Sequence, residues 1–200
     1  MDNNPQVWAE INLPALQRNY DRIKEITTSE IMPIVKANAY GHGLVPVAQA
    51  LDEKGARRFG ISNMAEALEL RKLFPDCKIM LVGALPMESI PTIVREEIIC
   101  GVHRLEQAIL LSEEGERQGK KATIHIKVDT GMGRLGFRME DWEDILKATQ
   151  LPNLYVEGIY THFATADHLD LAYAKEQLAK FNQITEYLKS RGVDIPLRHA

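Results

Sequence analysis

Short β-branched segments alternate with longer amphipathic segments along almost the whole 200-residue sequence. The period of the apolar positions predicts strands and helices in turn. The expected strands are 31–36, 58–62, 78–82, 98–102, 122–128, 154–160 and 195–199, and the expected helices are 15–25, 45–54, 65–73, 89–95, 105–117, 141–148 and 170–189. Residues 7–11 are expected to form a further extended piece. Alternation at this spacing is typical of βα units on a parallel sheet.

Seven predicted strands, without 7–11, favour an α/β fold of the (β/α)8 TIM-barrel type that lacks one unit. A closed barrel of this type has eight strands in roughly 250 residues. The sequence ends on a predicted core strand, so we expect a truncated chain or a fragment. We interpret residues 1–200 as one barrel domain that stops before its last βα unit.

The charge and the apolar pattern exclude several classes of protein. The net charge is −4 and the sequence pI about 5.9, which argues against nucleic-acid binding and against a polybasic membrane contact. No signal-peptide pattern and no apolar run of about 18 residues is present, so a cytoplasmic location is expected. Cys77 and Cys100 are expected to be buried free thiols, and no cluster has metal-ligand spacing.

The segment 31–43 carries the first chemical motif. Lys36 closes an apolar predicted strand, and Tyr40, Gly41 and Gly43 follow it in a tight loop. Catalytic groups of barrel enzymes lie at the carboxyl ends of strands. A partly desolvated lysine there can present a neutral amine, which attacks an aldehyde to form a Schiff base. An exposed lysine before an ordinary glycine turn, or a Schiff-base aldolase without a cofactor, fits the same residues.

The segment 124–136 carries the second motif. Its apolar residues alternate with His125, Lys127 and Asp129, so one face of the predicted strand is polar. Buried charges require partners or a function. Arg134 follows in a glycine-rich loop, where its guanidinium can bind a carboxylate bidentately. A Lys-Asp-Arg network that only stabilises the barrel mouth is the alternative.

Two histidines lie near predicted strand ends, a position that suits a site residue. They are His162, in the sequence T-H-F-A-T-A-D, and His199. A hydrogen-bonded core histidine explains each of them almost as well. The other four, which we interpret as structural or as part of a loop, are His42, His103, His125 and His168.

Three blocks together resemble the alanine racemase family. V-K-A-N-A-Y-G-H-G at 35–43 is similar to the attachment signature of that family for pyridoxal 5'-phosphate (PLP), and D-T-G-M-G-R-L-G at 129–136 and T-H-F-A-T-A-D at 161–167 follow in the family's order. The resemblance extends from Trp8 to His199. It implies that Lys36 holds PLP as an internal aldimine and exchanges the α-proton on one face of the substrate. Tyr40 is then expected near the cofactor phosphate.

The resemblance assigns further roles in the second half of the chain. Arg134 is expected to contact the substrate carboxylate and the phenolic oxygen of PLP, and Lys127 to carry a carbamate (N6-carboxylysine) that orients Arg134. His162 is expected near the cofactor ring, and His199 to stack close to it. No metal is expected.

The implied activity is the interconversion of L-alanine and D-alanine by an isomerase with two bases, which supplies D-alanine for peptidoglycan. In this family a tyrosine from the C-terminal β domain of a partner subunit is the second base, so a homodimer is expected of the full-length protein. That domain and the arginine at the pyridine nitrogen lie beyond residue 200, and we expect little activity from the 200 residues alone. A PLP amino-acid decarboxylase on the same barrel, a non-catalytic PLP carrier and a racemase of serine or of several amino acids remain as alternatives.

Overall fold

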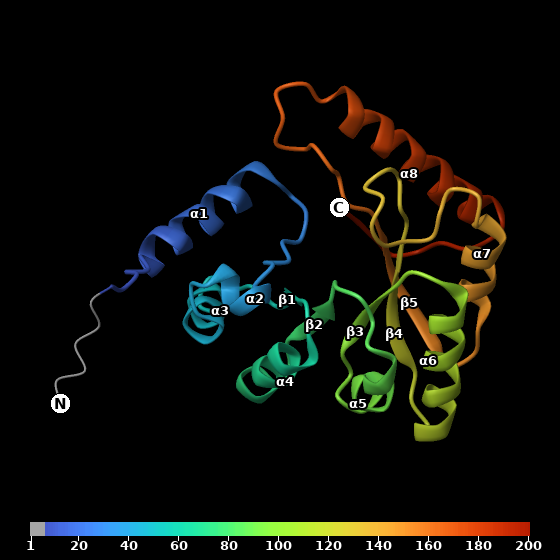
Figure 1. Ribbon diagram of the computed structural model, residues 1–200, viewed down its shortest axis with the longest axis horizontal. Coiled ribbons are helices and arrows are strands. Elements are labelled where there is room, and N and C mark those ends of the chain that lie inside the picture. Colours follow the sequence, from blue (N-terminus) through green and yellow to red (C-terminus); the bar gives the residue numbers. More distant parts are fainter. Residues whose placement is uncertain (1–6) are drawn as a thin grey trace. The chain divides into compact units, whose positions relative to one another are not determined.

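The computed structural model describes residues 7–200 (Figure 1). The chain divides into two compact units, one that runs to Ile79 and one over Met80–Ala200. We describe each unit by itself.

The first unit contains a long helix, a short strand and three further helices. Its elements are α1 (Leu13–Ile26), α2 (Lys36–Tyr40), α3 (Leu44–Asp52), β1 (Arg58–Ile61), α4 (Met64–Leu73) and the beginning of β2 (Lys78–Leu81). Asn12 begins α1, because its side-chain oxygen accepts a hydrogen bond from the Ala15 amide at 2.9 Å. The Gln17 side chain then joins α1 to the Ala50 carbonyl of α3 at 2.9 Å.

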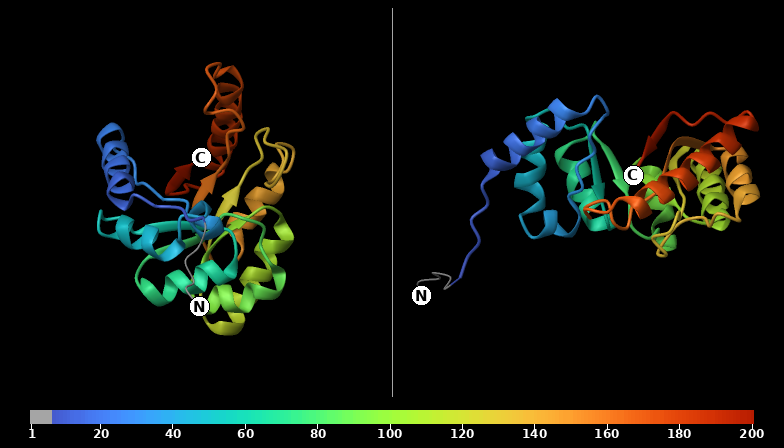
Figure 2. Two further views of the ribbon diagram at one scale, coloured as in Figure 1. Left: turned by 60° about the vertical axis from the view of Figure 1, so that its left-hand side comes forward. Right: turned by 90° about the horizontal axis from the view of Figure 1, so that it is seen from above.

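The second unit repeats strand and helix in regular order. Its elements are the end of β2, η1 (Met87–Ser89), α5 (Ile90–Arg95), β3 (Ile99–Val102), α6 (Leu105–Gln118), β4 (Ala122–Lys127), α7 (Trp142–Gln150), β5 (Leu154–Tyr160), α8 (Ala172–Ser190) and β6 (Leu197–His199). Neighbouring strands from β2 to β6 pair in parallel. Helices α6, α7 and α8 cover the outer face of these strands (Figures 1 and 2). Strand residues such as Ile124 and Ile126 are fully buried.

The strands lie in the sheet in the order of the sequence, from β1 to β6. Parallel strands in this order, with helices between them, confirm the α/β class and the incomplete (β/α)8-type barrel. The predicted bounds of β5 are those of the structure, and both buried thiols, Cys77 and Cys100, are free. No helix within residues 7–200 combines the length and the apolar character that crossing a membrane requires.

The predicted strand 31–36 is absent as a named strand, so the described part of the chain has six named strands and not seven. Residues 7–11 contain no strand. In the segment 31–36 only Ile34 forms a parallel bridge, with Gly60. Pro33 has no amide hydrogen to continue a ladder, and the chain leaves the extended conformation directly after Val35.

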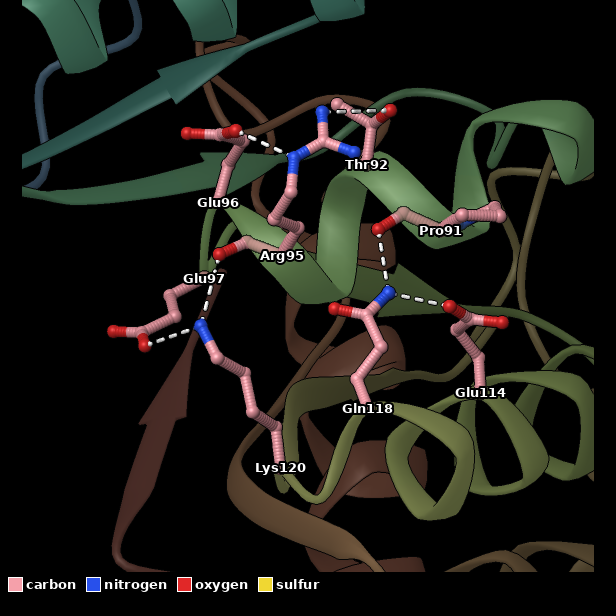
Figure 3. A network of polar contacts seen from close by, with 8 residues as sticks. All are labelled: Pro91, Thr92, Arg95, Glu96, Glu97, Glu114, Gln118 and Lys120. Atoms are coloured by element: carbon pink, nitrogen blue, oxygen red, sulfur yellow. Dashed lines mark hydrogen bonds and ion pairs between the residues drawn. The ribbon is translucent and has the colours of Figure 1, made fainter.

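A polar network joins α5 to α6 at the amino-terminal side of β3 (Figure 3). The Gln118 side chain donates to the Pro91 carbonyl at 2.8 Å. Lys120 donates to the Arg95 carbonyl at 3.0 Å and to the Glu97 carboxylate at 3.1 Å. This network holds α5 and α6 together. Because it lies before the first residue of β3, it is away from the carboxyl end of that strand.

Candidate active site

Lys36 begins a turn of left-handed helix in the first unit. The parallel bridge between Ile34 and Gly60 includes a hydrogen bond from the Val35 amide to the Gly60 carbonyl at 2.8 Å. The next residues, Ala37 to Tyr40, all have φ between 51° and 54°. An L-residue in this conformation costs roughly 1–2 kcal/mol, with asparagine the most tolerant. Such strain persists only where the surroundings enforce it, and it clusters at functional sites.

Backbone hydrogen bonds close the turn and lead into α3. The Ala39 amide donates to the Val35 carbonyl at 2.8 Å, and the Gly43 amide to the Asn38 carbonyl at 3.0 Å. The Asn38 side-chain oxygen also accepts from the Leu44 amide at 2.7 Å, which places the first residue of α3. The sequence predicted a tight glycine loop here, and the loop is present with a left-handed turn before it.

The structure brings two predicted site residues of the first unit together. The Lys36 ammonium group lies 5.9 Å from the centre of the Tyr40 ring. Lys36 is half-buried, whereas Tyr40 is 61 % exposed. Lys36 therefore lies beside an exposed aromatic residue whose hydroxyl can donate to a ligand.

Glu66 of α4 is a buried charged residue that the sequence analysis missed. Its carboxylate accepts from the Asn38 amide at 3.0 Å and from the Ser62 amide at 3.1 Å. Asn63 begins α4 by accepting from the Glu66 amide at 3.0 Å. An Asn-x-x-Glu pattern signals a capping box and so marks the start of a helix. It does not reveal that the carboxylate reaches the Lys36 turn.

In the second unit a chain of polar side chains crosses β4, β5 and β6, buried at His125 and Glu157 and half-buried at His199. Nδ1 of His125 lies 2.8 Å from Nε2 of His199, and Nε2 of His125 lies 3.1 Å from the Glu157 carboxylate. His125 and Glu157 are 2 % and 4 % exposed. The carboxylate favours a proton on Nε2 of His125, which leaves Nδ1 to accept from His199. The interpretation of His125 as a structural residue omitted this contact with His199.

His199 and Lys127 both lie beside the Tyr160 ring. The rings of Tyr160 and His199 stack with 4.7 Å between centroids and 3° between planes. The Lys127 ammonium group lies 5.3 Å from the centre of the Tyr160 ring. Burial raises the pKa of Tyr160, so its hydroxyl stays protonated and can donate.

Two buried polar atoms near these strand ends lack a hydrogen-bond partner within residues 7–200. They are the Tyr160 hydroxyl oxygen and Nε2 of His103. Burial, with smaller contributions from Lys127 and Arg104, lowers the pKa of His103 to about 4. Unpartnered buried polar groups are costly, and each calls for an explanation such as a bound or attached group.

Arg134 lies exposed on a loop that Asp129 shapes. The Asp129 carboxylate accepts from the Gly131 and Gly133 amides, both at 3.0 Å. These hydrogen bonds from main-chain amides to Asp129 differ from the Lys-Asp-Arg network that was considered as an alternative. Among the described residues no ion pair or hydrogen bond engages the Arg134 guanidinium, which leaves it available for a carboxylate.

Gln177 of α8 joins the loop of Arg134 to that of His162, and no pattern in the sequence pointed to it. It is fully buried. Its side-chain oxygen accepts from the Ala164 amide at 2.9 Å. Its side-chain nitrogen donates to the Thr130 hydroxyl at 3.3 Å and to the His162 carbonyl at 3.2 Å. His162 itself is exposed.

Parallel βα units with polar groups gathered near the ends of their strands define a protein of the (β/α)8-barrel class. Residues 11–200 match the family described as alanine racemase, N-terminal domain. The chain belongs to this family.

Relatives of known name agree with that assignment. An alanine racemase of Methanococcus maripaludis is 45 % identical over 97 % of this chain and 53 % of its own length. The structure of an alanine racemase of Clostridium difficile 630 in complex with cycloserine has a TM-score of 0.91 at 34 % identity, over 98 % of this chain and 56 % of that one. A Bartonella henselae alanine racemase with covalently bound pyridoxal phosphate gives 0.86 at 26 %, over 95 % and 53 %. The chain thus spans about half the length of these relatives.

Proposed function

We propose that this chain carries the PLP-binding part of an alanine racemase, an isomerase that interconverts L-alanine and D-alanine. The strained turn that presents Lys36 carries the proposal. A relative at 26 % identity is described with covalently bound pyridoxal phosphate, and a primary amine is the group that binds an aldehyde covalently.

The residues of the turn fit this cofactor. Lys36 is half-buried and its amine lies 5.9 Å from the centre of the exposed Tyr40 ring, whose hydroxyl can donate to a phosphate oxygen. When bound, PLP supplies an electron sink for the charge left at the α-carbon. Lys36 then moves a proton at that carbon on one face of the substrate.

Arg134 and Lys127 are proposed to act on the substrate and on each other. The unengaged Arg134 guanidinium binds the substrate carboxylate and the phenolic oxygen of the cofactor. A carbamate on Lys127 converts a buried cation into an anion that accepts hydrogen bonds. The unpartnered Tyr160 hydroxyl supports this modification, because it can donate to a group near Lys127.

His162 and His199 are proposed to lie near the cofactor ring. The stacking of His199 on Tyr160 and its contact with His125 hold the His199 imidazole in one orientation, as a residue beside a ring requires. The exposed His162 follows β5 on a loop fixed by Gln177.

The remaining proposals concern the protein of which these residues are part. The second base, on the opposite face of the substrate, is a tyrosine supplied by a partner subunit of a homodimer. The product D-alanine serves peptidoglycan synthesis in the cytoplasm. The support is the family membership and the names of the relatives.

The test is to add PLP to the chain, record the visible spectrum, reduce with borohydride and map the labelled peptide. We expect a visible band and a pyridoxyl group on Lys36, both absent in Lys36→Arg. Lys72→Arg, at an exposed position of α4, is the matched control and should label as the parent does. Label spread over exposed lysines, unchanged in Lys36→Arg, would contradict the proposal.

A further inference from the structure

We propose that Glu66 is a positioning residue for Lys36: its carboxylate holds the left-handed turn and thereby directs the lysine amine. The proposal rests on the proposed function for the use of that amine. Glu66 lies outside the sequence motifs, and among the described residues its carboxylate makes no hydrogen bond to Lys36 or Tyr40.

The two oxygens of the carboxylate join two segments that are distant in the sequence. Oε1 accepts from the Asn38 amide at 3.0 Å, and Asn38 lies within the turn, two residues after Lys36. Oε2 accepts from the Ser62 amide at 3.1 Å and from the Ser62 hydroxyl at 3.3 Å, directly after β1 ends. Because β1 is part of the sheet, the Glu66 carboxylate connects the turn to a rigid element.

A carboxylate is suited to this position because every group that faces it is a donor. A hydrogen bond with an ionised partner is roughly twice as strong as a neutral one. Glutamine has nearly the same shape, but its NH2 group must face one of the two amide hydrogens and cannot accept from it. Glu66 is 8 % exposed, so water replaces these bonds poorly.

Asn38 transmits the restraint to both ends of the turn. Its amide is held by Glu66, and its side-chain oxygen accepts from the Leu44 amide at 2.7 Å. Its φ of 54° suits asparagine better than other non-glycine residues. With Asn38 fixed, Lys36 before it and α3 after it are fixed as well.

A residue that only begins α4 would behave differently. Asn63 already caps this helix, and loss of such a cap alters α4 without altering the amides of the Lys36 turn. The proposal therefore predicts effects at Asn38 and Lys36, which lie outside α4.

The first measurement is amide hydrogen exchange, by NMR, of Asn38 and Ser62 in the parent, Glu66→Gln, Glu66→Ala and Glu69→Gln. Glu69 is exposed on the same helix and is the matched control. We expect exchange at Asn38 to rise roughly tenfold or more in Glu66→Ala, as for loss of a hydrogen bond to a charged group, and by less in Glu66→Gln. Unchanged exchange at Asn38 in both variants would overturn the proposal.

The second measurement is the share of borohydride-fixed pyridoxyl label on Lys36, with the visible circular dichroism of the loaded chain. The isosteric Glu66→Gln should lower both, while Glu69→Gln should lower neither. Faster exchange at Asn38 with parental labelling and dichroism would reduce Glu66 to a structural role and overturn the proposal. If the parent itself fails to label Lys36, the proposed function fails, and exchange at Asn38 alone decides whether Glu66 holds the turn.

Discussion

Glu66 in the first unit and Gln177 in the second both hold loops by hydrogen bonds, but they do so with different functional groups. Each is a buried helix side chain that reaches a loop beyond a strand. Glu66 only accepts, from the Asn38 amide of the strained turn and from the amide and hydroxyl of Ser62. Gln177 both accepts and donates, and it joins two loops.

The difference follows from the backbone that each residue holds. In the left-handed Lys36 turn the Asn38 amide donates to a side chain of another element, so an anion stabilises the turn. The loops around Thr130 and His162 present a hydroxyl, a carbonyl and an amide, which a neutral amide side chain can satisfy together. The charged Glu66 therefore holds the strained turn, and the neutral Gln177 holds loops that present both donors and acceptors.

The largest expected effect is at Gln177. Gln177→Leu removes three hydrogen bonds of a fully buried side chain, to the Ala164 amide, the Thr130 hydroxyl and the His162 carbonyl, and should lower the free energy of unfolding by about 3 kcal/mol. Gln183→Leu, at an exposed position of α8, is the control. Urea unfolding measures both. An equal, small effect of the two substitutions would remove the distinction drawn between Gln177 and an ordinary helix residue.

A pH effect of similar size is expected from His103. The pKa of His103 is about 4 in the folded chain and 6.5 in the unfolded chain, so the unfolded chain binds more protons between these two pH values. The stabilisation from the neutral imidazole is complete above pH 6.5 and is lost as the pH falls through 4, by roughly 3 kcal/mol in total. His103→Gln should flatten this part of the stability curve in denaturant titrations from pH 7 to 4. A parental slope in the variant would show that another group causes it.

A smaller effect distinguishes left-handed from right-handed backbone directly. Ala37→Gly relieves a φ of 52° and should stabilise the chain by about 1 kcal/mol. Ala179→Gly, at an exposed position in the right-handed α8, should destabilise it by roughly 0.5–1 kcal/mol. The pair is measured by thermal unfolding, and the opposite signs are the prediction. Destabilisation by both would mean that the turn at Ala37 is not left-handed in solution.

The sequence predicted the regular elements well because apolar periodicity encodes them. The bounds of β5 were correct, and the alternation in β4 placed Lys127 on a polar face, which is buried. The motifs also pointed to Lys36 and Tyr40, which the structure brings together.

The rest depends on contacts between residues far apart in the sequence. The segment before Lys36 was predicted as a strand because it is apolar, but its left-handed continuation is stabilised by Glu66, 28 residues from Asn38. The contact of His125 with His199 spans 74 residues, and that of Gln177 with Thr130 spans 47. Local patterns carry no information on such pairs.

The central claim is that a turn held in a left-handed conformation presents Lys36 to the cofactor. Its most direct test is the visible circular dichroism of the chain after addition of PLP. A cofactor held in one orientation gives a dichroic band in the visible region, and we predict this band in the parent and its loss in Lys36→Arg. Visible absorbance without a dichroic band, equal in the parent and in Lys36→Arg, would contradict the claim.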